Sequence, residues 1–291
     1  MSVYRVRHVT RYVYEAPVVH AHHHCHLRPR QFDWQGVAKH DLDVVPSAAV
    51  RRSVDYFGNQ IHVLEVASDH EVLDVVSSSV VEVAPRPEVP PAGGLAWDEV
   101  ARRFRSVGAP LSALEFAFDS PLVRAHPLLA AYAEPVFPAG RPIVEAVRQF
   151  CRKIFDEFQY ETRVTDVSTP LGQVLRERRG VCQDFAHVAI GCLRSLGLAA
   201  RYVSGYLETL PPAGKPRLVG ADASHAWASV FVPGYGWLDF DPTNDVLPGV
   251  RHVTVAWGRD FSDVSPLKGV VLGGGTHRVT VSVDVEPVDV A

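Results

Sequence analysis

The first part of the chain alternates between two kinds of side chain with a period of two. In the stretch YRVRHVTRYVY, the basic residues Arg5, Arg7 and Arg11 share one face. The other face is mainly aromatic and apolar and carries Tyr4, Val6, His8, Thr10, Tyr12 and Tyr14. Such alternation is typical of β-strands. Further strand-like runs, HDLDVV and IHVLEVA, are separated by the turn signal YFGNQ, so residues 1–84 are predicted to form an antiparallel β-rich domain.

Prolines and glycines interrupt this pattern in the stretch APRPEVPPAGG. Because such a stretch suits neither a helix nor a central strand, we predict a linker over residues 85–94. Beyond it, apolar residues recur at helical spacing, as in PIVEAVRQFCRKIFDEF. Residues 95–291 are therefore predicted to form a helical segment followed by a core that includes the C-terminal strands. The fold class we expect is α+β.

The composition limits the class of protein. With 291 residues, of which 47% are hydrophobic, the chain can bury a sizeable core. Its net charge of -4 gives no basic surface of the kind that binds nucleic acid. We find no signal-peptide pattern and no run of eighteen apolar residues, so we expect a soluble, cytoplasmic protein without a nucleic-acid or membrane partner. The four cysteines fit neither a zinc pattern nor a dense disulfide framework and are expected to be reduced.

One cysteine stands at a chemically active position. In RERRGVCQDFAHVAI, Gly180 precedes Cys182, and an apolar stripe at helical spacing follows: Val181, Phe185, Val188, Cys192 and Leu196. Cys182 is therefore predicted to lie in the first turn of a helix that ends near Gly197. The unpaired N–H groups and the helix dipole at that end stabilise a thiolate, and Arg178 and Arg179 are expected to add to this. The same N–H groups suit the oxyanion of a tetrahedral intermediate.

A thiolate nucleophile requires a base and a group that orients the base. The stretch SHAWASVFVPGYGWLDFDPTND is predicted to form two strands joined by the turn VPGYG. If the loop holds an odd number of residues, Phe231 faces Trp237 and His225 lies diagonal to Asp241 on the same face. Asp239 has the same parity but lies one step further from the histidine. Geometry therefore favours Cys182, His225 and Asp241 as a catalytic set.

Three stretches of this sequence resemble a known family. RGVCQDFAHVA, SHAWASVFVPGYGW and DFDPTN are similar to the catalytic boxes of the transglutaminase-like superfamily, in the order Cys, His, Asp. HVTRYVYEAPV with LRPR resembles the β-rich N-terminal region of bacterial members. GRDFSDVSPLKGVVLGGG with HRVTVSVDV resembles their C-terminal segment, which places the GRDFSDVSP loop near the cleft.

The resemblance implies a papain-like catalytic core. In it, Cys182 attacks an amide carbonyl, His225 transfers protons and Asp241 fixes the imidazole. The acyl-enzyme then passes to water, as in a cysteine protease or amidase, or to an amine, as in a cross-linking acyltransferase. Many members carry a glutamate shortly after the tryptophan of the histidine box, whereas here Ala228 and Ser229 follow Trp227, which bears on substrate preference.

Several neighbours of this set are candidates for shaping the site. Tyr160 and Gln183 are candidate donors to the oxyanion, although a structural role is favoured for both. Trp227 is expected to pack around the site or to line a substrate groove, and the sequence does not choose between these roles for it or for Trp237 and Trp257. Asp184 and His187, three residues apart, are expected to pair across the helix surface.

The histidine cluster in HAHHHCHLRPR is a second candidate site, for binding a metal ion. If this stretch is a strand, His20, His22, His24 and His26 project from one face, and imidazoles are common metal ligands. Side chains on one face of a strand are spaced by about 6.5–7 Å, so four of them cannot converge on one ion without a bend or another strand. We therefore favour adventitious or no metal binding at these positions.

The function that the sequence predicts is thiol-dependent acyl transfer on a protein, peptide or small amide substrate. Hydrolysis is favoured over amine transfer because no dedicated amine site is recognisable. No cofactor is expected, since there is no acidic loop of the EF-hand kind that would bind calcium. The alternative is an inactive binding scaffold of the same fold. The substrate and the oligomeric state stay open.

Overall fold

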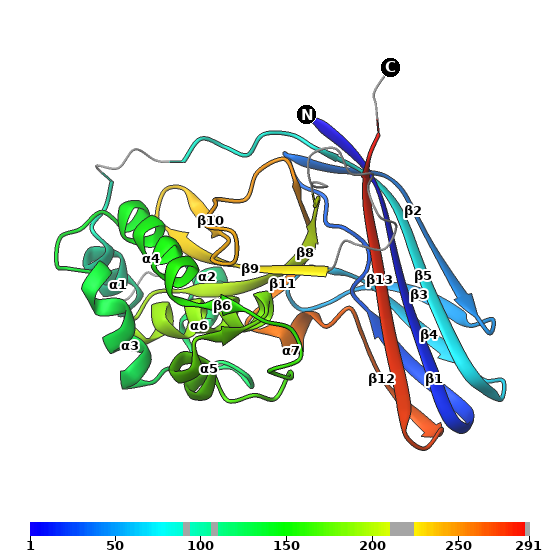
Figure 1. Cartoon of the computed structure of the whole chain (residues 1–291). Coiled ribbons are helices and arrows are strands. Elements are labelled where there is room, and N and C mark those ends of the chain that lie inside the picture. The colour runs from blue at the N-terminus through cyan, green and yellow to red at the C-terminus, as the bar shows by residue number, and fades with distance from the viewer. Residues whose placement is uncertain (90–93, 106–109, 210–223, 289–291) are drawn as a thin grey trace, which may run out of the picture.

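Long antiparallel strands on one side of the molecule and helices on the other flank a small central sheet (Figure 1). The computed structural model describes residues 1–89, 94–105, 110–209 and 224–288. The first five strands are β1 (Ser2–Cys25), β2 (Gln35–Val45), β3 (Ala49–Val54), β4 (Gln60–Val66) and β5 (His70–Val83). The expected α+β fold is confirmed: an antiparallel β half-barrel is followed by a core of helices and strands.

The second part of the chain holds the helices and the remaining strands. Its helices are α1 (Trp97–Arg105), α2 (Leu111–Leu114), η1 (Glu115–Ala117), α3 (Pro127–Ala133), η2 (Glu134–Val136), α4 (Ile143–Glu157), α5 (Leu171–Glu177), α6 (Cys182–Ser195) and α7 (Phe261–Val264). Its strands are β6 (Gln159–Tyr160), β7 (Arg179–Gly180), β8 (Ala200–Leu207), β9 (Ser224–Val232), β10 (Gly236–Phe240), β11 (His252–Gly258), β12 (Leu267–Gly273) and β13 (His277–Pro287). No helix in the described ranges is long and apolar enough to cross a bilayer.

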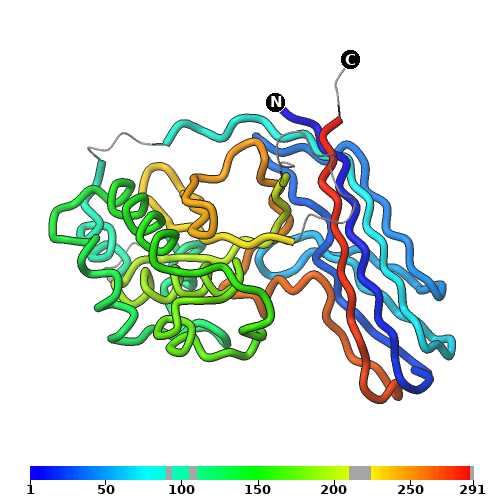
Figure 2. Tube along the Cα trace, in the orientation of Figure 1, coloured from blue at the N-terminus to red at the C-terminus, as the bar shows by residue number. Residues whose placement is uncertain are grey.

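Strand β1 organises the half-barrel. Its first part pairs with β5 and β13, and its second part pairs with β4 and β12. The register shifts between Val13 and Val18, where the chain turns back on itself (Figure 2). Buried apolar residues fill the space within the folded sheet: Tyr14, Val18, Ala21, Cys25, Leu27, Leu64, Val66, Leu73, Val75 and Leu267.

The C-terminal strands belong to this half-barrel, so our grouping of residues 267–287 with the core was wrong. β12 and β13 both run antiparallel to β1, and the first and last strands lie side by side in Figure 2. Between β12 and β13, the chain turns through three glycines with positive φ: Gly273, Gly274 and Gly275. This turn lies beside the bend in β1. Alternation identifies a strand but not its partner, which explains the error.

The central sheet has the order β10-β9-β8-β11, and its strands are antiparallel. Helix α6 packs against β8 and β9, and most of its residues are buried because its sequence is apolar on nearly every side. Residues 85–89 of the expected linker form neither helix nor strand, and residues 90–93 lie outside the described ranges. The sheet and α6 together fix the positions of the residues predicted to carry the chemistry.

Candidate active site

Cys182 is the first residue of α6, as predicted. The turn before it is held by Asp184, whose Oδ2 accepts hydrogen bonds from the Val181 amide at 2.8 Å and from the Thr165 hydroxyl at 2.7 Å. The Asp184 carboxylate thus caps the N-terminus of α6. A Cβ at Gly180 would lie 2.5 Å from Oδ2 of Asp184, so glycine at this position leaves room for the capping carboxylate. The cap leaves Cys182 partly exposed at a helix end whose N–H groups have no partner within the helix.

The two arginines before the helix do not supply the expected free positive charge. Nη1 of Arg178 lies 2.9 Å from Glu157, and Nε of Arg179 lies 3.2 Å from Glu177. Because a carboxylate balances each cation, the helix end and a neighbouring histidine are left as the groups that stabilise a thiolate on Cys182.

The hairpin that carries the histidine and the aspartate has the predicted register. Phe231 pairs with Trp237 in the β9–β10 ladder, so the odd loop is confirmed. Nε2 of His225 lies 2.7 Å from Oδ2 of Asp241, and the carboxylate is fully buried. Asp239 instead accepts a hydrogen bond from the indole of Trp227 at 3.0 Å. The structure therefore brings His225 to Asp241 and not to Asp239.

The surroundings of His225 favour its positively charged form. Burial alone would lower its pKa, but hydrogen bonds with Asp241 and Cys182 and the negative charges of both partners raise the pKa of His225 to about 10. Burial opposes the charge of Asp241 as well, yet hydrogen bonds from His225 and His252 hold the pKa of this carboxyl well below its usual range. An imidazolium at neutral pH, in contact with Cys182, favours the thiolate that a nucleophile requires.

His252 and Asn244 complete the surroundings of Asp241. Nε2 of His252 lies 3.2 Å from Oδ2 of Asp241, and Nδ2 of Asn244 donates to the same oxygen at 2.7 Å. Neither residue was predicted. Asn244 follows directly in the DFDPTN box and could have been found there. His252 enters from β11, and no local pattern marks it.

These residues also form the single group in the described ranges that could hold a metal ion. The ligand atoms of His225, Asp241 and His252 lie within 4.8 Å of one another. Both imidazoles, however, hydrogen-bond to the carboxylate through Nε2. An ion would have to replace both bonds, so the arrangement fits a hydrogen-bonded catalytic set better than a metal centre.

A cleft of about 560 Å³ opens above Cys182 and His225. Tyr160 and Gln183 line it, and their role as donors to an oxyanion stays a prediction. Trp227 does not line this cleft and is fully buried beside His225, with 6.1 Å between the ring centroids. Its role is therefore to support the imidazole.

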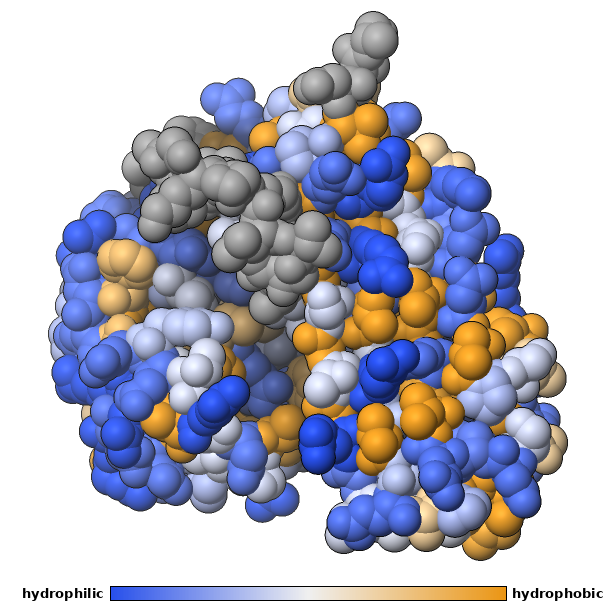
Figure 3. Space-filling model, turned by 45° about the vertical axis from the view of Figure 1, so that its right-hand side comes forward, coloured by the Kyte–Doolittle hydropathy of each residue, from blue (hydrophilic) through white to orange (hydrophobic). Residues whose placement is uncertain are grey.

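The half-barrel supplies the opposite wall of the cleft. The cleft is lined on this side by His8, Thr10 and Tyr12 of β1 and by Val279 and Val281 of β13. Figure 3 shows a hollow between the two halves of the molecule, with apolar residues along its sheet side. The residues described as lining the cleft include no aspartate, glutamate, lysine or arginine. Burial lowers the pKa of His8 to about 4, so this histidine is neutral as well.

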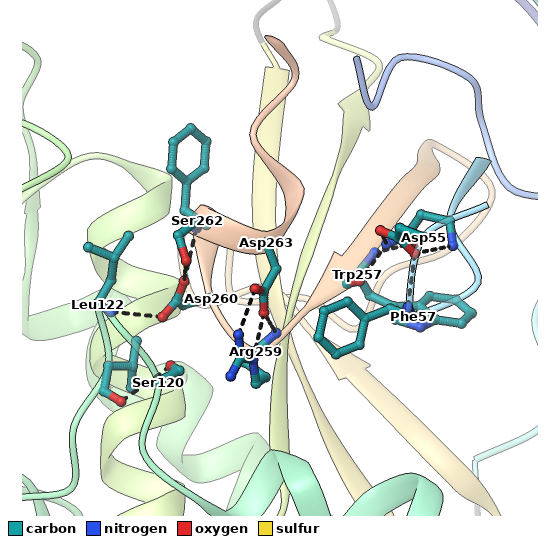
Figure 4. Close-up of polar contacts among 12 residues, drawn as sticks. Asp55, Phe57, Ser120, Leu122, Trp257, Arg259, Asp260, Ser262 and Asp263 are labelled. Carbon is teal, nitrogen blue, oxygen red and sulfur yellow. Dashed lines mark hydrogen bonds and ion pairs between the residues drawn. The ribbon is translucent and has the colours of Figure 1, made fainter. Parts of the chain in front are cut away.

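The loop after β11 closes one end of the cleft, as the resemblance implied. Phe261 and Ser265 line the cleft. The fully buried Asp260 anchors the loop by accepting hydrogen bonds from the amides of Leu122 and Ser262 (Figure 4). The expected pair between Asp184 and His187 does not form, because His187 accepts from the Phe261 amide instead.

The four histidines of the N-terminal cluster do not meet at one point. His20 lies 3.7 Å from Glu65, and the rings of His22 and His24 are 5.7 Å apart. His26 is buried and contacts the carboxylate of Asp55 at 3.1 Å. Among the four, His22 and His24 are the pair whose rings contact each other in the described structure.

Comparisons with known proteins cover almost the whole chain. Residues 4–82 match the family model of the bacterial transglutaminase-like N-terminal region, and residues 130–242 match that of the transglutaminase-like superfamily. An uncharacterized protein of Mycobacterium tuberculosis is 42% identical over 294 residues, which cover 98% of this chain and 92% of that protein. A protein-glutamine gamma-glutamyltransferase of Pseudomonas aeruginosa is 42% identical over 72 residues, 24% of this chain and 11% of that enzyme.

One solved structure shares the fold from end to end. It is that of a Cytophaga hutchinsonii protein proposed to be a cysteine protease. The two chains superpose with a TM-score of 0.78 at 20% identity, covering 100% of this chain and 92% of the other. The arrangement of half-barrel and core is therefore shared with a known structure.

Proposed function

The chain belongs to the transglutaminase-like superfamily, and on that premise we propose that it is a thiol-dependent enzyme that transfers the acyl group of an amide. The observation that supports this most strongly is the contact between a cysteine at a helix N-terminus and a charged histidine held by a buried carboxylate. Cys182, His225 and Asp241 form that set. A scaffold without activity would have no need to keep a charged imidazole beside a thiol.

The first half of the reaction forms a thioester. The Cys182 thiolate attacks the amide carbonyl carbon, a C–S bond forms, and the oxyanion is stabilised by N–H groups at the start of α6. His225 gives its proton to the leaving nitrogen as the C–N bond breaks, and ammonia leaves from a primary amide or an amine from a substituted one. Asp241 holds the imidazole through Nε2, so Nδ1 is the nitrogen that faces the thiol and the leaving group.

The second half regenerates the thiolate. Water or an amine attacks the thioester carbonyl, neutral His225 removes a proton from the attacking group, and the C–S bond breaks. We favour water as the acceptor. The described cleft residues include no carboxylate that would gather a primary ammonium ion, and the cleft is open to solvent at Cys182.

The lining of the cleft suits an uncharged amide. Apart from the reacting pair Cys182 and His225, its described residues are apolar, aromatic or neutral polar, so a further charged group next to the scissile bond would lose hydration without gaining a partner. The side-chain amide of glutamine, flanked by apolar residues in a peptide, meets this requirement. The segment shared with a protein-glutamine gamma-glutamyltransferase supports glutamine as the first substrate to test.

The test measures both acceptors at once. Glutamine-containing peptides and small primary amides are incubated with the native chain, with and without a labelled primary amine, and ammonia release and amine incorporation are followed. Cys182→Ala should abolish both signals. Cys192→Ala removes the same atom from the same helix at a buried position, and it should keep activity. Turnover that survives Cys182→Ala would overturn the proposal.

The result also separates hydrolysis from transfer. Ammonia release that is unchanged by the labelled amine, without label in the product, supports hydrolysis. Label in the product at the expense of the free acid would show amine transfer and overturn our preference for water.

A further inference from the structure

A second cavity, of about 450 Å³, lies on the face of the central sheet that carries Trp227 and His225, further along the strands. It has no lining residue in common with the catalytic cleft within the described part of the chain. Its described wall is rich in aromatic side chains: Phe32, Trp34, Tyr56, Phe57, Phe116, Tyr235, Trp237 and Trp257. Its volume falls in the range of small-molecule sites in proteins.

Arg201 of β8 is buried in the wall of this cavity, and no hydrogen bond joins its guanidinium to another residue within the described ranges. Its guanidinium carbon lies 4.2 Å from the ring centroid of Trp237 and 3.8 Å from that of Trp257. The side chain is 6% exposed, and its Nε makes no hydrogen bond to any residue that the structure describes. A buried cation whose donors are unpaired costs free energy unless an anion satisfies it.

The one buried carboxylate nearby is already engaged. Asp239 accepts from Nη1 of Arg86 at 2.5 Å and from the indole of Trp227 at 3.0 Å. Its charge acts on Arg201, but so do the opposing charges of Arg30 and Arg86, and burial lowers the pKa of Arg201 to about 9. Two guanidinium groups of the cavity wall, those of Arg86 and Arg201, thus face a single buried carboxylate. The third, Arg30, does not line the cavity, and the charge of Asp55 acts on it.

The remaining acid of the cavity wall does not correct this imbalance. Glu115 lies in the wall, and its charge acts on Arg259. Since Glu115 is only half-buried, solvent screens it. The charge excess next to Arg201 therefore stays positive.

The wall is held in place before any ligand arrives. The side chain of Asn59 bonds to both the N–H and the C=O of Trp257, at 3.0 and 2.8 Å. Oδ1 of Asp55 accepts from the amide of Phe57 (Figure 4). It also accepts from the amide of Asn59. These bonds tie the loop with Phe57 to the strand with Trp257. Because the wall is already ordered, its residues lose little conformational entropy when a ligand binds.

We propose that this cavity binds a small monocarboxylate with a flat apolar body. The fork of a guanidinium matches the two oxygens of a carboxylate, and the single unpaired cation matches one negative charge. A dianion such as phosphate would bring a second charge into an aromatic wall that does not solvate it. The apolar body of the ligand would pack on the aromatic rings, as in most small-molecule sites.

Calorimetric titration of the full chain with phenylacetate and phenylacetamide tests the site. The two probes have nearly the same shape, but only phenylacetate is charged. We expect phenylacetate to bind the native chain at least tenfold more tightly, and Arg201→Gln to remove that preference. Arg152→Gln, on the exposed face of α4, should leave it unchanged.

The comparison of the two probes on the native chain decides the matter even if Arg201→Gln does not fold. Equal binding of both probes, no binding of phenylacetate at millimolar concentration, or a preference that survives Arg201→Gln would overturn the proposal. Repeating the titration with Cys182→Ala makes the result independent of the proposed catalysis, because Cys182 does not line this cavity.

Discussion

His252 and His225 share one oxygen of Asp241. Nε2 of His252 lies 3.2 Å and Nε2 of His225 lies 2.7 Å from Oδ2 of the carboxylate. Burial lowers the pKa of His252, whereas that of His225 is raised, so one imidazole is neutral and the other is charged. One carboxylate supports one cation, and the neutral histidine acts as a fixed donor that orients the carboxylate.

Replacing His252 should therefore slow the chemistry without weakening substrate binding. His252→Ala removes a hydrogen bond to a charged group, worth about 1.5–3 kcal/mol, and we expect kcat on the amide identified in the screen to fall by about tenfold or more. KM should stay unchanged because His252 does not line the cleft. His252→Gln, which keeps a donor, should recover part of the rate. A folded His252→Ala with native kcat would contradict the role.

The charge on His225 should appear in the pH dependence of stability. Its pKa is about 10 in the folded chain and 6.5 in the unfolded chain, so its stabilisation is complete below pH 6.5, declines as the pH rises, and is lost above pH 10. The free energy of unfolding of the native chain minus that of His225→Gln should therefore shrink between pH 6.5 and 10, by at most about 5 kcal/mol.

Chemical denaturation at several pH values measures this difference. The same comparison is made in the Asp241→Asn background, which lacks the negative charge beside His225. There, the difference in free energy of unfolding caused by His225→Gln should change much less with pH. A difference between the native chain and His225→Gln that does not change with pH would mean that His225 is not held as an imidazolium.

Gly205 on β8 leaves the space that Trp227 occupies beneath His225. A Cβ at this position would lie 2.2 Å from the backbone oxygen of Val253 and 2.5 Å from the indole of Trp227. Gly205→Ala should therefore cost about 1–3 kcal/mol of stability and lower kcat, because the indole must move. Gly249→Ala, where no atom lies within 4 Å of the added carbon, should stay within about 0.5 kcal/mol of the native chain. Equal behaviour of the two variants would contradict this packing argument.

The parts of the site that the sequence predicts are those fixed by local geometry. The helix start at Cys182 follows from the apolar spacing, and the pairing of Phe231 with Trp237 follows from the parity of the loop. Both features depend on residues close together in the chain. The relation of His225 to Asp241 therefore follows from parity together with position along the strand, which sets Asp241 apart from Asp239.

The missed features depend on which distant segments pair. His252 reaches Asp241 because β11 joins the sheet beside β8, an order that periodicity does not encode. The last strands pair with β1 for the same kind of reason. Arg178 was expected to act on Cys182, but the distant Glu157 pairs with it, and a sequence does not show such a long-range pair. The pair of Arg179 with Glu177 is local and could have been expected.

The central claim is that His225 keeps Cys182 as a reactive thiolate, and the rate of alkylation measures this directly. Iodoacetamide labelling of each cysteine is followed by mass spectrometry from pH 5.5 to 9, for the native chain and for His225→Gln. The other three thiols are buried, and burial raises the pKa of each. We expect Cys182 to react fastest, to keep its rate down to pH 6, and to lose this reactivity in His225→Gln. A rate at Cys182 that rises with pH like that of an ordinary thiol, or that does not respond to His225→Gln, would contradict the account.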